Sequence, residues 1–103
     1  MDKPFEIKIK NKADKLTLKF SGSLVINYIE EITKEVKEKM DMSKAIHVNI
    51  ANPENIDLTF IQLVMSIQKT CINKNIEFTV SAKIKEDQKL LLTNAGFNSI
   101  ISN

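Results

Sequence analysis

Apolar and polar residues alternate in four short segments of the chain, with the two-residue period of β-strands that bury one face. The segments are residues 5–10, 16–20, 45–50 and 76–81. A polar stretch between the first two, residues 11–15, predicts a turn and therefore a β-hairpin. The sequence Ser21-Gly22-Ser23 is expected to end the second strand of that hairpin.

Two further segments repeat apolar residues every three or four positions, as an α-helix with one buried face does. The first apolar stripe consists of Val25, Tyr28, Ile29, Ile32, Val36 and Met40. The second stripe, which stops before Asn73 to Asn75, consists of Phe60, Leu63, Val64, Ile67 and Cys71. A third helix is expected at residues 86–95, closed by Gly96 and followed by an apolar tail that docks on the body, with Phe97, Ile100 and Ile101.

The order of these elements, ββαβαβα, predicts an α/β fold with a four-stranded mixed sheet. After the antiparallel hairpin, each strand–helix–strand unit should reach a parallel neighbour by a right-handed crossover. Parallel strands covered on both faces read as continuous apolar runs, whereas these strands alternate strictly. We therefore expect all helices on one face, and a second face open to water that carries Lys8, Lys19, His47, Asn49, Glu77 and Thr79.

Length, charge and cysteine content narrow the class of protein. A chain of 103 residues fits one domain over residues 1–103. The net charge is only +2 and the lysines form no basic stripe, so no nucleic-acid partner is expected. No apolar run approaches the roughly 18 residues of a membrane helix, so no direct membrane insertion is expected. Residues 1–5 lack the apolar core of a signal peptide and one cysteine cannot form an internal disulfide, which predicts a cytoplasmic protein.

No set of catalytic or ligating side chains is evident, so the sequence predicts no enzyme, no cofactor and no metal site. The single histidine, His47, falls on the polar side of the third strand, and the single cysteine, Cys71, falls on the apolar stripe of the second helix. A structural zinc site needs four cysteine or histidine ligands. Phosphate-binding glycine motifs and nucleophile motifs are also missing from the sequence.

The segment from Asn55 to Leu63 is the best candidate for function, because it leads from the third strand into the second helix. Binding sites of open α/β sheets collect beyond the carboxyl ends of the strands. Asp57 or Thr59 is expected to cap the helix, and this alone explains both residue types. The free N–H groups of the helix terminus would also favour a phosphate on the Thr59 hydroxyl. Asp57 would repel that phosphate and make the modification easier to reverse.

The same helix has an apolar arc wider than one buried face requires. The additional residues are Leu58, Ile61, Met65 and Ile72. They either pack against neighbouring helices or form an exposed patch for a protein partner.

Four segments, in their order and spacing, resemble the STAS domain family of anti-sigma-factor antagonists. The first two are the turn into the first helix, Leu18–Leu24, and the third strand, Ala45–Ala51. The other two are the start of the second helix, Ile56–Leu63, and the end of the third helix, Ala95–Phe97. The family fold places its helices on one face of a sheet, which is what the strict alternation of the strands predicts independently.

The resemblance implies a regulatory protein-binding module of bacterial signalling. In sigma-factor regulators of the family, the second hydroxyl of the motif D-S-S-G is phosphorylated by a kinase that is also the anti-sigma factor. Thr59 takes the place of that residue and Asp57 that of the conserved aspartate, while Leu58 and Phe60 replace the first serine and the glycine. The implied partner-binding residues are Asp57, Leu58, Phe60, Ile61, Gln62 and Met65.

Two alternatives remain open at this point. The segment Asp57–Leu63 is most similar to STAS proteins that accompany chemotaxis-type signalling systems, where the chain would be a non-phosphorylated adaptor. It would otherwise be the STAS subunit of a phospholipid transporter. The first strand is expected at the sheet edge, where Lys8 and Lys10 discourage edge-to-edge pairing, so we expect a monomer when the partner is absent.

Overall fold

A computed structural model describes residues 3–40, 43–94 and 101–102 of the chain. Short connections join its strands and helices. In chain order these are β1 (Phe5–Asn11), β2 (Lys15–Leu24), a 3-10 turn (Ile26–Tyr28), α1 (Ile29–Lys39), β3 (Ala45–Ala51), β4 (Asn55–Ile56), α2 (Leu58–Asn73), β5 (Phe78–Lys83), α3 (Glu86–Asn94) and β6 (Ile101–Ser102).

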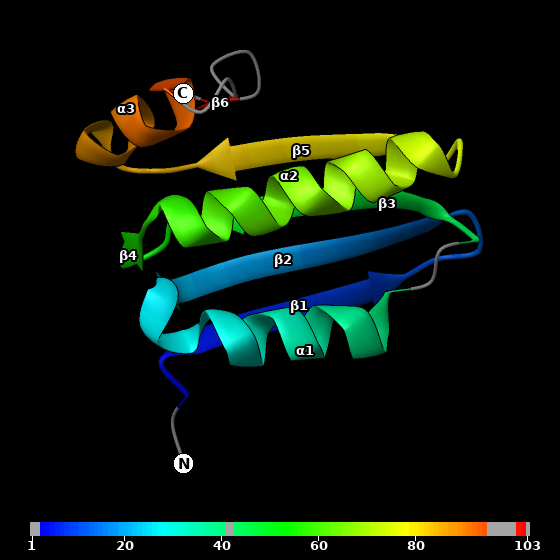
Figure 1. Cartoon of the computed structure of the whole chain (residues 1–103), viewed down its shortest axis with the longest axis horizontal. Helices are drawn as coiled ribbons and strands as arrows, with labels where there is room; N and C mark the ends of the chain where they lie inside the picture. The colour runs from blue at the N-terminus through cyan, green and yellow to red at the C-terminus, as the bar shows by residue number, and fades with distance from the viewer. Residues whose placement is uncertain (1–2, 41–42, 95–100, 103) are drawn as a thin grey trace.

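The strands form one mixed sheet in the order β1-β2-β3-β5-β6 (Figure 1). β1 runs antiparallel to β2, and β2, β3, β5 and β6 run parallel to one another. The predicted α/β fold with a hairpin followed by parallel strands is therefore confirmed, and β1 lies at the expected edge. Two strands of two residues each, β4 and β6, were not predicted from the pattern.

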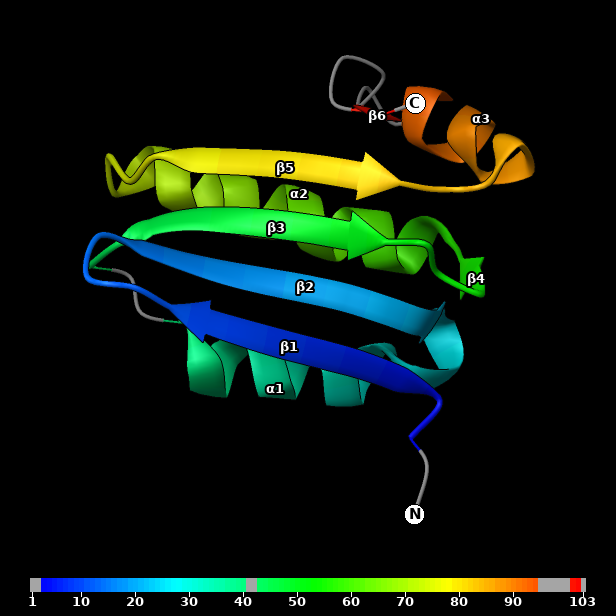
Figure 2. The same ribbon diagram turned by 180° about the vertical axis from the view of Figure 1, so that it is seen from behind.

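Helices α1 and α2 cover one face of the sheet and leave the other face open, as the alternating strands predict (Figures 1 and 2). α3 lies beyond β5 at the far side of the sheet (Figure 1). Between the layers, Phe20 of β2 and Phe60 of α2 meet edge to face, with ring centroids 5.0 Å apart and planes inclined by 70°. Both side chains are 0% exposed, so they lie at the centre of the core.

The second strand is longer than its sequence pattern indicates. β2 continues through the serine–glycine–serine turn to Leu24, because Gly22 pairs with Phe5 of β1. Gly22 has a φ of +87°, and a Cβ atom built on it would lie 2.6 Å from the carbonyl oxygen of Pro4. Only glycine fits this close approach, which lets β2 extend as far as the start of α2. The first helix correspondingly begins later, with a 3-10 turn after Val25 and α-helix from Ile29.

At the carboxyl end of the chain, α3 covers the predicted helix up to Asn94. Gln88, near its start, donates from Nε2 to the carbonyl oxygen of Pro53 at 3.3 Å and so ties α3 to the loop after β3. The predicted cap at Gly96 and the apolar residues Phe97 and Ile100 lie outside the described residues. Ile101 belongs to β6, whose backbone pairs with Ala82 of β5.

Within the described ranges, none of the helices has the length and the apolar character needed to cross a membrane.

Candidate docking site at the start of helix α2

The segment that leads into α2 is held against the end of β2 by backbone hydrogen bonds. β4 pairs in parallel with Ser23 and Leu24. The N–H of Glu54 donates to the carbonyl oxygen of Gly22 at 2.8 Å, and the N–H of Asp57 donates to that of Leu24 at 3.1 Å. The first turn of α2 therefore sits at the carboxyl edge of the sheet, where the 3-10 turn after β2 also lies (Figure 1).

Asp57 is the N-cap residue of α2, as one of the two predicted alternatives requires. Its Oδ1 accepts a hydrogen bond from the Thr59 backbone N–H at 3.0 Å and a second from the Thr59 hydroxyl. Its Oδ2 accepts from the backbone N–H of Ile26 at 2.9 Å. One carboxylate thus caps α2, holds the threonine side chain and binds the turn that precedes α1, 31 residues earlier in the chain.

The same hydrogen bonds set the charge of the site. Partial burial alone would raise the pKa of Asp57, but the bonds donated by the Thr59 hydroxyl and by the backbone N–H groups of Ile26, Thr59 and Phe60 outweigh it. The pKa of Asp57 is therefore held below its usual range, since each of these donors favours the ionised form. At neutral pH the site presents a carboxylate whose oxygens already accept protein donors.

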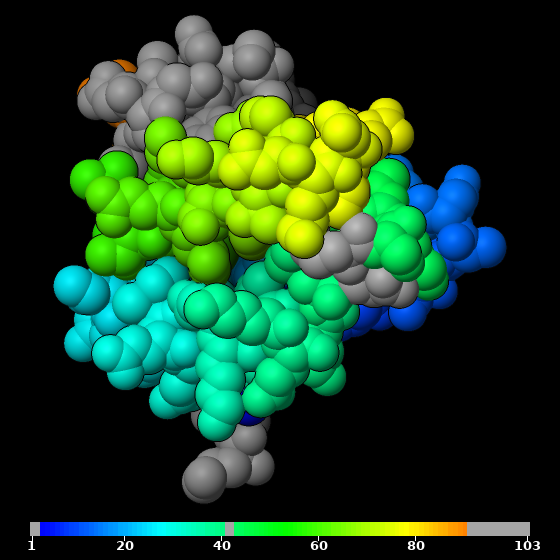
Figure 3. All heavy atoms as spheres, turned by 45° about the vertical axis from the view of Figure 1, so that its right-hand side comes forward, coloured from blue at the N-terminus to red at the C-terminus, as the bar shows by residue number. Residues whose placement is uncertain are grey.

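Three large apolar side chains near this carboxylate are exposed, together with polar ones. Leu58 is 49% exposed and Met65, two turns along α2, is 43% exposed; Gln62 between them is also exposed. Ile26, whose N–H binds Asp57, is 63% exposed. We define the docking surface by residues at the cap and along the first two turns of α2, none of them buried, namely Ile26, Leu58, Thr59, Gln62 and Met65. Figure 3 shows the start of α2 (green) and the turn before α1 (cyan) side by side on one side of the molecule.

Phe60 and Ile61 lie beneath the docking surface. Both are 0% exposed and belong to the main hydrophobic core. Of the two interpretations open for Ile61, packing inside the protein is therefore the one the structure shows, whereas Leu58, Met65 and Ile72 are exposed. In this structure a partner can reach Leu58, Gln62 and Met65 but not Phe60 or Ile61, which instead hold the first turn of α2 in place.

Ile26 is the one residue of the docking surface that the sequence did not indicate. It directly follows the first residue of the predicted helical stripe and has no periodic signal of its own. Only the bond from its N–H to Asp57 reveals that it adjoins the start of α2. A long-range contact of this kind leaves no mark in a single sequence.

His47 and Cys71 lie on opposite sides of the sheet and cannot act together. His47 is on the open face, where its Nδ1 is 2.6 Å from Thr79 Oγ1 and its Nε2 is 3.1 Å from Ser81 Oγ. Cys71 is 0% exposed within the core, and burial raises the pKa of its thiol. Across the part of the chain that the structure describes, no three histidine, cysteine, aspartate or glutamate side chains gather in a group that could hold a metal ion.

Comparison with known proteins identifies the fold through one solved structure. No family model matches the sequence, and no curated protein sequence matches it either. Among solved structures, the unphosphorylated form of the anti-sigma factor antagonist SpoIIAA superposes with a TM-score of 0.73. The match covers 94% of this chain and 86% of that one, at 11% sequence identity. The chain therefore has the STAS fold, the fold of an anti-sigma factor antagonist.

Proposed function

We propose that this protein is a regulatory protein-binding module, in which the docking surface binds a protein partner and phosphorylation of Thr59 by a partner kinase releases it. The observation that carries the proposal is the placement of one hydroxyl. Thr59 lies at the start of α2, bonded to a charged Asp57 and surrounded by exposed Leu58 and Ile26. The structurally similar protein is an anti-sigma factor antagonist described in its unphosphorylated form, which supports the same role here.

Phosphorylation would change this surface strongly. A phosphothreonine carries a charge of about −1.5 to −2 at neutral pH. The Thr59 hydroxyl could no longer donate to Asp57, and the new phosphate would lie beside a carboxylate that is already ionised. Both the added charge and the displaced cap would oppose the binding of a partner that contacts Leu58 and Met65 through apolar groups.

A second function, that of a non-phosphorylated adaptor in a chemotaxis-type complex, is favoured by a different observation. The Thr59 hydroxyl already has a partner in Asp57, and the side chain of Phe60 occupies the core where the motif of sigma-factor regulators has glycine. In this case Thr59 only supports the cap, and the docking surface binds its partner without a switch.

The two functions make different predictions for Thr59→Glu. The test is a pull-down from the native cell extract with wild type, Thr59→Glu and Asn73→Glu as baits, read by mass spectrometry. Asn73 is exposed at the far end of α2, so its variant carries the same added charge away from the docking surface. A phospho-switch predicts that a kinase-like protein binds wild type and Asn73→Glu but is lost with Thr59→Glu.

Recovery of the same partner by all three baits would contradict the switch and support the adaptor. Loss with both glutamate variants would show a general effect of charge and contradict a specific role for Thr59. Phosphopeptide mapping of the protein from its own cells supplies an independent readout, because only the switch requires a modified Thr59.

A further inference from the structure

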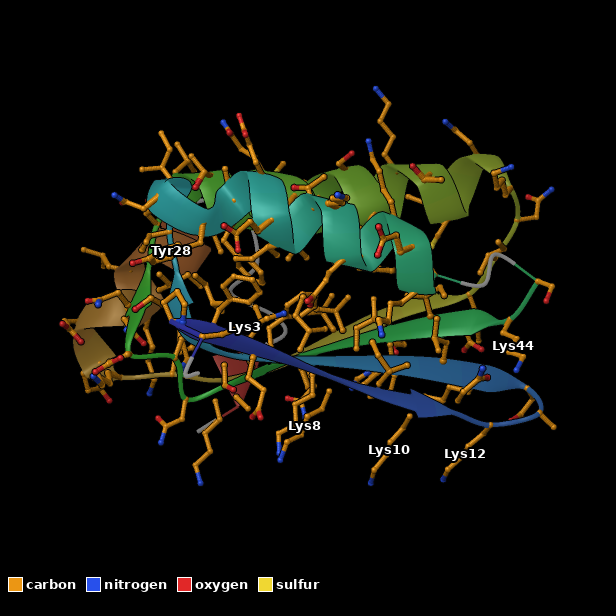
Figure 4. All side chains as sticks on the ribbon, turned by 90° about the horizontal axis from the view of Figure 1, so that it is seen from below. Lys3, Lys8, Lys10, Lys12, Tyr28 and Lys44 are labelled. Atoms are coloured by element: carbon orange, nitrogen blue, oxygen red, sulfur yellow. The ribbon has the colours of Figure 1, made fainter. Side chains whose placement is uncertain are left out.

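The sheet pairing gathers lysines that are scattered in the sequence. On the open face, β1 contributes Lys8 and Lys10, and β2 contributes Lys15 and Lys19. Lys8 lies directly opposite Lys19, and Lys10 lies opposite Thr17, which has Lys15 and Lys19 two residues to either side. Figure 4 shows Lys8, Lys10 and Lys12 pointing away from the helix layer. The basic patch that the sequence did not show is thus created by the register of the hairpin.

This arrangement is not what stability alone favours. Like charges directly opposite each other on antiparallel strands repel and destabilise the pair. Lys8 has only an exposed contact to Glu6 at 3.9 Å. Among the residues that the structure describes, no salt bridge neutralises Lys10, Lys15 or Lys19. Discouraging edge-to-edge pairing accounts for Lys8 and Lys10 on the edge strand β1. Lys15 and Lys19 lie on the inner strand β2, where that reason does not apply, so their charge indicates another use.

The rest of the open face indicates what kind of partner fits. Beside the lysines lie one exposed carboxylate, Glu6, and short polar side chains. His47 is hydrogen-bonded at both ring nitrogens to Thr79 and Ser81. Protein interfaces are enriched in aromatic residues and arginine and depleted in lysine. Proteins that hold single-stranded nucleic acid rely on aromatic platforms. The open-face positions of β1, β2, β3 and β5 carry no phenylalanine, tyrosine or tryptophan, and the sequence contains no arginine.

The shape of the molecule, like its charge, is suited to binding a flat surface. The molecule is a slab with extents of 36 × 35 × 21 Å, and the open sheet is one of its two broad faces. Lysines near an anionic bilayer are attracted to it without any apolar group entering the lipid. We propose that the open face of the sheet, centred on Lys8, Lys10, Lys15 and Lys19, binds an anionic lipid surface. The binding is peripheral and leaves α1, α2 and the docking surface turned away from the lipid.

This proposal does not rest on the proposed function, because the two involve different faces and different residues. Its test is co-sedimentation of the full chain with vesicles of phosphatidylcholine alone, or of phosphatidylcholine with about a third of phosphatidylglycerol. Wild type is expected to bind only the anionic vesicles at low salt, and to lose them near 1 M salt, where the screening length falls to about 3 Å.

Charge reversal locates the binding face. Lys10→Glu with Lys19→Glu is expected to weaken binding to anionic vesicles by about tenfold or more. Lys37→Glu with Lys69→Glu changes the net charge equally but alters exposed residues of α1 and α2, so it should bind nearly as wild type does. The open-face variant should also resist urea at least as well as wild type, because each new glutamate lies close to a remaining lysine.

Three results would overturn the proposal. They are equal binding to neutral and anionic vesicles, equal losses in the two double variants, and absence of binding to any vesicle. In the last case, binding of an oligonucleotide or of polyglutamate that is lost in the open-face variant would assign the face to a different macromolecule.

Discussion

Replacing Phe60 by alanine is expected to lower the free energy of unfolding by about 3–5 kcal/mol, because the change empties the centre of the core. The Phe60 ring is 0% exposed and meets Phe20 edge to face, so its loss removes both buried area and an aromatic pair. Domains of this size are stable by only about 5–15 kcal/mol. Urea unfolding followed by circular dichroism measures the loss directly, and a markedly lower midpoint is expected.

Met65→Ala on the same helix is the matched control. Met65 is 43% exposed, so its truncation should change stability far less than that of Phe60. Phe60→Leu should lie between wild type and Phe60→Ala, since it keeps most of the apolar volume. Equal effects of Phe60→Ala and Met65→Ala would show that α2 does not pack on the sheet as described. Phe60 follows Thr59 directly, so its buried ring anchors the first turn of α2 to the sheet. A glycine at position 60 would remove that core contact.

Replacing Asp57 by alanine is expected to cost about 2 kcal/mol, at the upper end of the range for an N-cap. The substitution removes the acceptor for both Thr59 donors and for the Ile26 N–H. The effect should depend on pH. The folded-state pKa of Asp57 is held below the unfolded value, so its contribution is complete above the unfolded pKa of about 3.9 and is lost as pH falls through the folded pKa.

The measurement is urea unfolding of wild type and of Asp57→Ala between neutral and acid pH. The difference in stability between them should be largest near neutrality and should shrink below about pH 4. Thr59→Val, which removes only the hydroxyl bond, should fall between the two proteins. A difference that stays constant down to strongly acid pH would contradict the assigned role of the ionised carboxylate.

Much of this fold can be predicted from the sequence, because the alternation of strands and the apolar stripes of helices are local patterns. Alternation also predicted the covered and open faces correctly, since burying one side of a strand requires it. Two elements could not be predicted from apolar periodicity, the extension of β2 through Gly22 and the two-residue β4. Both are defined by backbone pairing and not by an alternation of apolar residues. The site was found in part for the same reason. Asp57 has a local cap signal, whereas its bond to Ile26 joins residues 31 apart in the chain. The sequence placed Lys8 and Lys19 on the open face, but their direct opposition depends on the register of the hairpin, which the apolar pattern did not specify.

The three pairings of β2 have a consequence for the order in which the molecule can be assembled during synthesis. Its antiparallel partner β1 precedes it, so the hairpin can form once residue 24 is available. Its parallel partners β3 and β4 come only after α1, and loops of that length close later than a tight turn. Until β3 has been made, the hairpin therefore has an unpaired inner edge, and the Asp57–Ile26 bond cannot form before the chain reaches residue 57.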